Sequence, residues 1–278
     1  MADIALDCSD GIAVIRFNRP DKLNALTLAM YADLAAAFDE VRDNDQIGVA
    51  ILTGSGDRAF CVGADLGESI PALAEGRFDI SEWDGAHQKH SQLTKPVIAA
   101  VNGLCLGGGF EIMLSTDLRI AAADAVFALP ETGIGVVPAG GTLTRLARQI
   151  PYAWAMELLL LGEQLDADTA LRYGLLNRVV AADVLDATAV ELAERLLARS
   201  GTALGVVKSS VRELGDMPQQ AAFHAEALYG QRAFQSDDAS EGLAAFAARR
   251  PPRFPSRAAQ TPPQGSSATT LFATEEPT

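Results

Sequence analysis

The chain has 278 residues, of which 49% are hydrophobic, and its 22 Lys+Arg against 36 Asp+Glu give a formal net charge of −14. This composition indicates a globular protein with room for one domain of about 200–250 residues plus appendages. It excludes a membrane span, since no apolar run reaches the roughly 18 residues required, and it disfavours nucleic acid and acidic membranes as partners.

Strand and helix patterns alternate over the first half of the chain. The turn at Ser9-Asp10-Gly11 predicts a hairpin, and Thr27 is the expected N-cap of a helix that ends near residue 44. Apolar patterns then predict the following elements: strands at 49–53, 96–101, 118–121 and 125–128, a helix at 83–93, and a helix that begins at Phe110. Alternation of this kind favours an α/β fold with crossover connections.

The second half of the chain, from Gly141 onward, is nearly all helical. Apolar spacing predicts helices at 141–149, 152–161, 167–173, 184–199, 203–214, 219–234 and 237–249. From Pro251 the chain is rich in Pro, Ser, Thr and Gln and has no periodicity. We therefore divide it into a core with the active site at 1–200, a C-terminal helical region at 201–256 and a disordered tail at 257–278.

Three consecutive glycines, Gly107 to Gly109, lie between the strand at 96–101 and the helix that begins at Phe110. A strand, a glycine turn and a helix N-terminus make a nest of N–H groups that suits negative charge. Neither a dinucleotide fingerprint nor a phosphate loop fits, because the glycine spacing differs and no Lys follows. A lone triple glycine is more often a tight turn, but here Glu111 follows in the first helical turn.

Glu111 and Glu131 form a candidate acid–base pair. The residues after Glu111 are apolar, so its carboxylate is expected to be partly desolvated, with a pKa raised toward values useful in proton transfer. Glu131 precedes a loop that is rich in Gly and Pro and more apolar than an ordinary surface loop. Its carboxylate is therefore expected to point into an apolar pocket. The simpler interpretations are a contact with the helix macrodipole for Glu111 and a backbone anchor for Glu131.

A second segment with a glycine, at 59–66, could bring its backbone close to the glycine turn and supply a second N–H donor. An oxyanion hole usually needs two N–H donors from separate segments that converge on one oxygen. Gly63 permits a close approach, and Ala64 presents its N–H with little side-chain obstruction. Asp65 lies three residues before Glu68, which matches a helix capping box, and we assign it to structure.

Neither a metal site nor an activated hydroxyl is predicted. His87 and His90 are three apart on the helix expected at 83–93, but no nearby Cys, Asp or third His completes a metal site. Ser55 is not in a nucleophile elbow, and no His follows at a useful place.

Two of the three cysteines, Cys61 and Cys105, are expected to be packing residues. Cys61 and Cys105 flank the proposed site but have no His in either motif that would activate a thiolate. Together with Cys8 they show no disulfide spacing, and the N-terminus lacks the regions of a signal peptide. We therefore expect a cytoplasmic protein that forms no covalent intermediate.

With these residues identified, the sequence resembles the enoyl-CoA hydratase/isomerase (crotonase) superfamily. The matching segments occur in the family's order from about Ile4 to Phe254, and they are 18–20, 23–26, 59–66, 95–111, 127–131, 140–142, 170–180 and 241–250. The resemblance implies a crotonase-like spiral of ββα units. It also implies that the C-terminal helical region mediates a homotrimer, commonly paired into a hexamer as a dimer of trimers.

The resemblance further implies an acyl-CoA substrate. Its thioester carbonyl oxygen would accept hydrogen bonds from the N–H groups of Ala64 and Gly108. Two basic residues, Arg19 and Lys22, are candidates for contact with the CoA phosphates. The residues implied to bind the CoA moiety are Lys22, Leu23, Asn24, Ala25, Ala64, Asp65 and Leu66. Coenzyme A is then part of the substrate, and no separate cofactor is implied.

Hydratases of the family resemble this chain in carrying Glu at positions 111 and 131. The implied reaction is the reversible syn addition of water to a 2-enoyl-CoA, in fatty-acid metabolism such as β-oxidation. Glu111 would act as base toward the water, and Glu131 would donate a proton to the α-carbon. A carnitinyl-CoA dehydratase-like reaction and a 3,2-enoyl-CoA isomerase remain alternatives. An RNA-binding member is disfavoured, because both glutamates are present and the charge is acidic.

Overall fold

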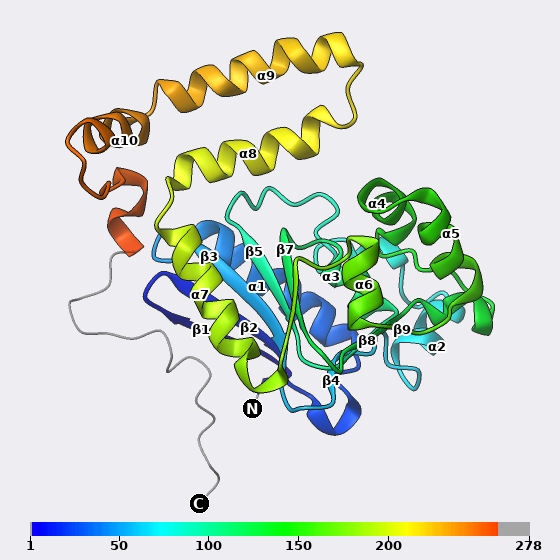
Figure 1. The fold of residues 1–278 in the computed structure, drawn as a ribbon. Coiled ribbons are helices and arrows are strands. Elements are labelled where there is room, and N and C mark those ends of the chain that lie inside the picture. The colour runs from blue at the N-terminus through cyan, green and yellow to red at the C-terminus, as the bar shows by residue number, and fades with distance from the viewer. Residues whose placement is uncertain (1, 261–278) are drawn as a thin grey trace, which may run out of the picture.

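Two sheets form the core of the structure, a computed structural model that describes residues 2–260 (Figure 1). The larger sheet has the order β1-β2-β3-β5-β7-β10 and the smaller β4-β6-β8-β9. The strands of the larger sheet are β1 (Ile4–Ser9), β2 (Ile12–Phe17), β3 (Val49–Gly54), β5 (Val97–Val101), β7 (Leu118–Ala122) and β10 (Arg178–Val180). Those of the smaller sheet are β4 (Ala59–Cys61), β6 (Leu104–Leu106), β8 (Val126–Ala128) and β9 (Leu165–Asp166).

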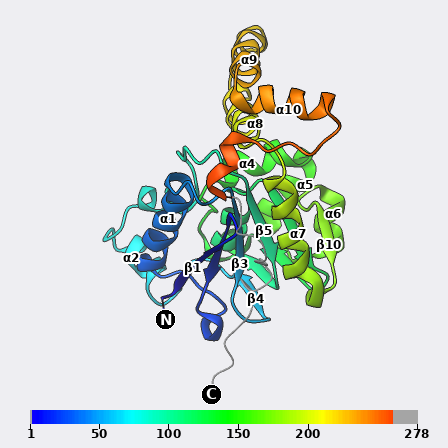
Figure 2. The ribbon, with the colours of Figure 1, turned by 90° about the vertical axis from the view of Figure 1, so that its left-hand side faces the viewer.

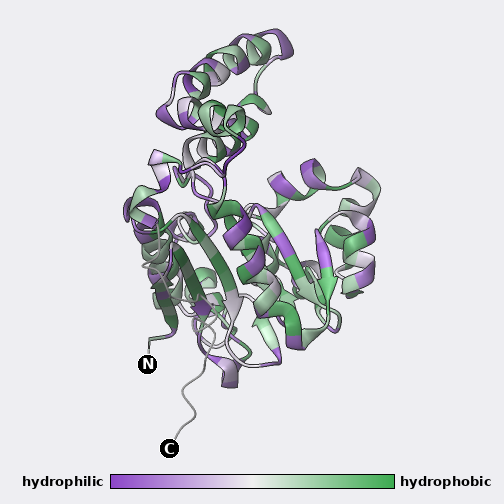
Figure 3. Ribbon diagram, turned by 60° about the vertical axis from the view of Figure 1, so that its left-hand side comes forward, coloured by the Kyte–Doolittle hydropathy of each residue, from purple (hydrophilic) through white to green (hydrophobic). Residues whose placement is uncertain are grey.

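The chain enters the larger sheet through the predicted hairpin. Asp10 and Gly11 have φ values of 54° and 82°, which suit the tight turn of twisted antiparallel strands. From β2 onward the neighbours in this sheet are parallel. A parallel sheet is covered on both faces and needs continuous apolar strands, and every residue of β3 and β5 is buried. Figure 3 shows these strands as a hydrophobic band inside the core.

Successive strands visit the two sheets in turn. β3, β5 and β7 lie in the larger sheet, whereas β4, β6 and β8, which follow them in the chain, lie in the smaller. The chain then turns into a short helix after β4 and after β6, namely α2 (Ser69–Ala74) and α3 (Gly108–Met113). The spiral of ββα units predicted from the sequence is therefore confirmed.

Two helices cover opposite faces of the larger sheet. α1 (Leu28–Asp43) packs in the same hydrophobic cluster as Ile15 and Leu52, and α7 (Leu185–Leu197) packs with Val14 and Ile51. Neighbouring strand residues thus face different clusters, as the pleat of a strand requires. Thr27 is the N-cap of α1, as predicted, and its hydroxyl accepts a hydrogen bond from the Met30 N–H.

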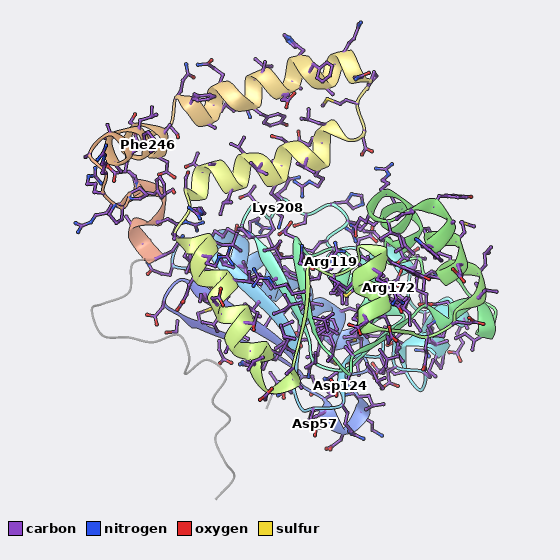
Figure 4. All side chains as sticks on the ribbon, in the orientation of Figure 1. Asp57, Arg119, Asp124, Arg172, Lys208 and Phe246 are labelled. Carbon is purple, nitrogen blue, oxygen red and sulfur yellow. The ribbon has the colours of Figure 1, made fainter. Side chains whose placement is uncertain are left out.

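The helices predicted after Gly141 are confirmed. They are α4 (Thr142–Gln149), α5 (Tyr152–Leu161), α6 (Ala167–Tyr173), α7, α8 (Gly201–Leu214), α9 (Gln219–Phe234) and α10 (Asp237–Ala247). The last three project from the core as an arm (Figures 1 and 2). Lys208 ties α8 to the core, because its Nζ donates to Asp117 at 2.7 Å (Figure 4). No helix among residues 2–260 has the length and apolar character needed to cross a bilayer.

The helix predicted at 83–93 is wrong. The structure has only a 3₁₀ turn, η2 (Ile80–Trp83), followed by further turns to His90. Asp79 and Glu82 form the capping box that starts η2. Gln88 then has a φ of 53°, in the left-handed region, which is incompatible with a continuing right-handed helix.

The disordered tail was predicted to begin at 257, and this boundary is also wrong. Pro255–Gln260 form a 3₁₀ helix, η5, that packs back on the core. Arg257 is buried, with its guanidinium donating to the carbonyl oxygens of Gly48 at 3.2 Å and Arg199 at 3.0 Å. Polar docking of this kind leaves no apolar periodicity in the sequence. The rest of the predicted tail, 261–278, lies outside the described residues.

Replacement of Arg257 should therefore destabilise the core. Arg257→Ala leaves buried carbonyl oxygens without their donor, and we expect a loss of about 2 kcal/mol in the free energy of unfolding. Arg253→Ala, which removes an exposed side chain of the same type, is the control. Urea unfolding at a fixed protein concentration measures both. Equal midpoints for the two variants would contradict the docking of η5.

Candidate active site

The loop after β4 and the N-terminus of α3 touch backbone to backbone. Gly63 has a φ of 87°, and a Cβ added to it would lie 2.7 Å from the Gly108 nitrogen. A Cβ on Gly109 would lie 2.2 Å from the Cys61 carbonyl oxygen. Gly107, with a φ of 49°, turns the chain from β6 into α3. Side chains at these positions would force the two segments apart.

This contact brings the two predicted N–H donors together. A Cβ on Gly108 would lie 3.7 Å from the Ala64 nitrogen, so the two peptide groups are neighbours. The adjacent N–H groups are occupied, because that of Asp65 donates to Leu26 and that of Gly107 to Ala128. Within residues 2–260 neither Ala64 nor Gly108 has a hydrogen-bond partner for its N–H. Two adjacent free donors are what an oxyanion hole requires.

Glu111 is buried in α3, with 3% of its surface exposed. Its Oε1 accepts a hydrogen bond from the Gly140 N–H at 2.7 Å. Burial, and then the charge of Glu131, raise the pKa of Glu111 to about 7, although the Gly140 N–H opposes the shift. The desolvated carboxyl group predicted from the sequence is therefore present, and its pKa suits proton transfer near neutral pH.

Glu131 lies in the 3₁₀ helix η3 (Pro130–Ile134) and points at the same glycine turn. A Cβ on Gly107 would be 3.0 Å from Glu131 Oε1. Burial raises the pKa of Glu131. Its Oε2 is buried and has no hydrogen-bond partner among the described residues. The structure thus gives Oε2 no backbone anchor and leaves it available to a bound molecule.

A cavity of about 870 Å³ joins these groups. Ala64, Gly108, Glu111 and Glu131, the four site residues predicted from the sequence, all line it. Its remaining walls are mostly apolar and include Ile70, Leu73, Ile80, Trp83, Val136 and Val137. An apolar cavity with a few convergent polar groups is the usual form of a small-molecule site.

The residues implied to bind CoA divide into two groups. Lys22, Ala25, Asp65 and Leu66 line the cavity together with Ala64. Leu23 and Asn24 are not among its lining residues, and both have positive φ values. Asn24 is fully buried, and its side chain donates to Ala59 O at 2.8 Å and accepts from Arg19 N at 2.9 Å. Its side chain therefore holds the surrounding loops in place.

Arg19 is already engaged within the protein. Its Nη1 donates to Ala25 O at 2.7 Å and pairs with Asp65 Oδ2 at 3.1 Å. Asp65 also accepts from the Gly67 N–H at 2.9 Å, and this bond and Arg19 lower the pKa of Asp65. Lys22, by contrast, is exposed where it lines the cavity, so it suits a phosphate contact better than Arg19 does.

The capping box predicted from Asp65 and Glu68 is wrong. Glu68 is itself the N-cap of α2 and makes no side-chain capping bond. Its carboxylate instead accepts from the Leu28 N–H, at the start of α1, at 3.3 Å. Asp65 is structural as assigned, but through Arg19 and Gly67 rather than through the helix end.

Sequence reasoning missed an aromatic stack beside the carboxylates. The ring of Tyr31 stacks on Trp83 with centroids 4.5 Å apart and lies 5.8 Å from the ring of His87. The Tyr31 hydroxyl is buried, has no partner among residues 2–260, and would lie 3.3 Å from a Cβ on Gly108. Tyr31 has the helical spacing of an ordinary core residue of α1, so no sequence signal distinguishes it.

The two histidines considered as metal ligands do not converge. His87 is buried, whereas His90 has 84% of its side chain exposed. The spacing that suggested a shared face assumed the helix at 83–93, which is absent. His87 belongs instead to the surroundings of Glu111.

A ββα spiral whose glycine turn, free N–H pair and buried carboxyl group share one cavity defines an enzyme of the crotonase class. The family model for enoyl-CoA hydratase/isomerase matches residues 7–257. The chain belongs to the enoyl-CoA hydratase/isomerase family.

Individual relatives have related names, and a solved structure of one such protein has the same fold. The chain is 38% identical over 249 residues to enoyl-CoA hydratase EchA19 of Mycobacterium tuberculosis, across 88% of this chain and 93% of that protein. It is 36% identical over 252 residues to a carnitinyl-CoA dehydratase of Proteus mirabilis, across 87% and 94%. The crystal structure of an enoyl-CoA hydratase from Bacillus anthracis matches with a TM-score of 0.86 at 32% identity, across 91% and 99%.

Glu111→Gln should stabilise the fold more at pH 8 than at pH 5. The pKa of Glu111 is about 7 in the folded chain against an ordinary 4.5, so the folded state binds more protons between these values. Wild-type stability therefore falls as the pH rises through this window, whereas an amide does not titrate. We expect the gain from the substitution to be about 2–3 kcal/mol larger at pH 8.

Thermal or urea unfolding at both pH values measures this difference. Glu163→Gln, which neutralises an exposed carboxylate, is the control and should behave alike at the two pH values. An equal effect of Glu111→Gln at pH 5 and pH 8 would show that Glu111 titrates normally.

Proposed function

We propose that the chain is an enoyl-CoA hydratase, which adds water to the double bond of a 2-enoyl-CoA thioester and catalyses the reverse dehydration. Two carboxyl groups and two free N–H donors on one apolar cavity support this function most strongly. Membership of the family and the relatives named enoyl-CoA hydratase support it as well.

In this proposal, the Ala64 and Gly108 N–H groups hold the thioester oxygen. Addition of water to the β-carbon moves the electrons of the double bond toward that oxygen, which becomes an enolate. Fixed donors stabilise this charge without reorganisation, and loss of one such donor typically costs about 2.7–4 kcal/mol in the transition state. The apolar walls of the cavity strengthen the interaction by excluding water.

Glu111 and Glu131 then divide the proton transfers. Glu111 takes a proton from the water as its oxygen bonds to the β-carbon, and Glu131 gives its proton to the α-carbon. The pair holds one proton before and after the step, and only its location changes. Two neighbouring carboxyl groups in a buried site favour this singly protonated state, because their charges repel.

The related reactions use the same groups. A carnitinyl-CoA dehydratase-like reaction is the second candidate, favoured by the 36% identity to the Proteus mirabilis protein of that name. A 3,2-enoyl-CoA isomerase would need only a Glu131-type residue to move a proton. Coenzyme A is part of the substrate in each case, and the proposal includes no further cofactor, no metal and no nucleic acid. The proposed setting is fatty-acid or related acyl-CoA metabolism in the cytoplasm.

We also propose that the arm assembles the chain into a homotrimer, and that two trimers can pair as a dimer of trimers. Large apolar side chains on α9 and α10 are exposed in the single chain, among them Phe234 at 77% and Phe246 at 86%. Figure 4 shows Phe246 on α10, within the arm. Apolar exposure on this scale marks an interaction surface. It supports the trimer implied by the resemblance.

Substitution in the arm should break this assembly. Light scattering should give the wild type a mass of three or six chains. Phe234→Glu combined with Phe246→Glu places two charges in the proposed interface, and we expect monomers with unchanged helix content by circular dichroism. Glu163→Gln provides a control that should leave the mass unchanged. A wild-type mass of one chain would contradict the proposal.

Hydration assays test the proposed reaction. Loss of absorbance on incubation with crotonyl-CoA and longer 2-enoyl-CoAs should show turnover by the wild type. Glu111→Gln and Glu131→Gln should each lower kcat by about 10²–10⁴-fold, because each removes a proton-transfer group. Glu163→Gln should retain full activity. Full activity in either active-site variant would contradict the two-glutamate mechanism. A wild type that is active only on 3-enoyl-CoA would be an isomerase instead.

A further inference from the structure

The Glu111 carboxyl group meets donors on one side and an imidazole nitrogen on the other. The Gly140 N–H and the N–H and hydroxyl of Thr142 oppose the rise in its pKa that burial causes, whereas His87 faces it with a ring nitrogen. Glu111 Oε1 accepts from the Gly140 N–H at 2.7 Å. Its Oε2 faces His87 Nε2 at 3.9 Å. A protonated carboxyl group has one oxygen that accepts and one that donates. In the protonated form, Oε1 can accept from the Gly140 N–H while the O–H at Oε2 donates to His87 Nε2. This match requires that His87 Nε2 carries a lone pair.

The hydrogen bond at the other ring nitrogen of His87 determines which tautomer is present. His87 Nδ1 lies 2.9 Å from the Trp83 carbonyl oxygen, which can only accept, so Nδ1 carries the proton. Burial lowers the pKa of His87 to about 4, so the imidazole is neutral at physiological pH. Its Nε2 then has a lone pair and no partner among the described residues.

Gly140 keeps the space between the two side chains open. A Cβ on Gly140 would lie 2.3 Å from His87 Nε2 and 2.8 Å from Glu111 Oε2. The imidazole itself is held by its neighbours, with ring centroids 5.8 Å from Tyr31 and 6.2 Å from Trp83. Closing the 3.9 Å separation to hydrogen-bond distance takes a movement of about 1 Å.

The other ionisable groups around Glu111 have different effects. Glu131, in η3, repels the ionised form of Glu111. Arg145, in α4, attracts it, but its Nη2 donates to Gln88 O at 3.0 Å. Tyr31, in α1, keeps its proton because burial raises its pKa well above 10. His87 differs from these groups because the atom that faces Glu111 Oε2, its Nε2 at 3.9 Å, can accept a hydrogen bond but not donate one.

We propose that His87 is a positioning residue that accepts a hydrogen bond from protonated Glu111 Oε2 while the Gly140 N–H holds Oε1. The proton of the glutamate pair then rests on Glu111 in the free enzyme, and Glu131 is ionised. This is the state that starts dehydration: Glu131 removes the α-proton, and Glu111 protonates the leaving hydroxyl group as the β-carbon–oxygen bond breaks. The consequence for turnover rests on the proposed function, but the hydrogen bond itself does not.

The pH profile of kcat/KM tests the role in turnover. We expect a bell-shaped plot of kcat/KM against pH, because the active glutamate pair carries one proton. The fall of kcat/KM at alkaline pH, here called the alkaline limb, reports the loss of that proton. His87→Phe removes the acceptor and destabilises protonated Glu111, so this limb should move to lower pH by about one unit, the effect of one ordinary hydrogen bond. His87→Gln places an amide oxygen near the position of Nε2 and should restore the wild-type limb.

An unmoved limb in His87→Phe would overturn the proposal, and so would a limb in His87→Gln that moves as far as in His87→Phe. A role in packing alone would lower thermal stability in both variants without shifting the limb. If His87→Phe does not fold, His87→Leu serves the same purpose, because it also lacks an acceptor.

Infrared difference spectroscopy of the free protein tests the hydrogen bond without substrate. The carboxyl band that disappears in Glu111→Gln should titrate near neutral pH in the wild type and about one unit lower in His87→Phe. A band that titrates alike in both proteins would refute the contact. If the wild type hydrates no 2-enoyl-CoA, the proposed function fails, and this titration still decides the role of His87.

Discussion

The site depends on the backbone contact between Gly63 and Gly108. Because neither residue has a side chain, the loop after β4 reaches the N-terminus of α3, and the N–H groups of Ala64 and Gly108 are left adjacent and free. The same turn places Glu111 within α3 and brings Glu131 against Gly107. The absence of side chains at Gly63 and Gly108 thus allows N–H donors and carboxyl groups from three separate segments to lie together.

Charge inside the cavity follows from burial. Ionising both glutamates in one apolar site is unfavourable, because each carboxylate is desolvated and the two charges repel. The pair therefore retains a proton near neutral pH. Outside the cavity the protein is acidic, with a net charge of −14, although the proposed substrate carries phosphates. Local cations must therefore compensate, and Lys22 is exposed at the cavity while Arg19 is held by Asp65. We expect CoA affinity to depend on a few side chains rather than on the overall field.

Long elements and glycine-linked residues were predictable from the sequence, whereas short or polar features were not. The helices after Gly141 have clear apolar spacing, and Gly107 to Glu111 combine a turn with a carboxylate in one segment. β4, β6 and β10 have three residues each and β9 has two, too few to show a period, whereas the equally short β8 was predicted because it lies in the apolar run 125–128. Arg257 docks through carbonyl oxygens, and Tyr31 has the spacing of any core residue, so neither leaves a signal.

The vibrational frequency of a bound thioester carbonyl tests the central claim most directly. Glu131→Gln should still bind a 2-enoyl-CoA while turning it over slowly, which leaves time for a difference infrared spectrum. If the Ala64 and Gly108 N–H groups hold the carbonyl oxygen, the stretch of this group should shift to lower frequency than in water, because fixed donors polarise the bond. A carbonyl band at the frequency of the free thioester would contradict the oxyanion hole and the mechanism built on it.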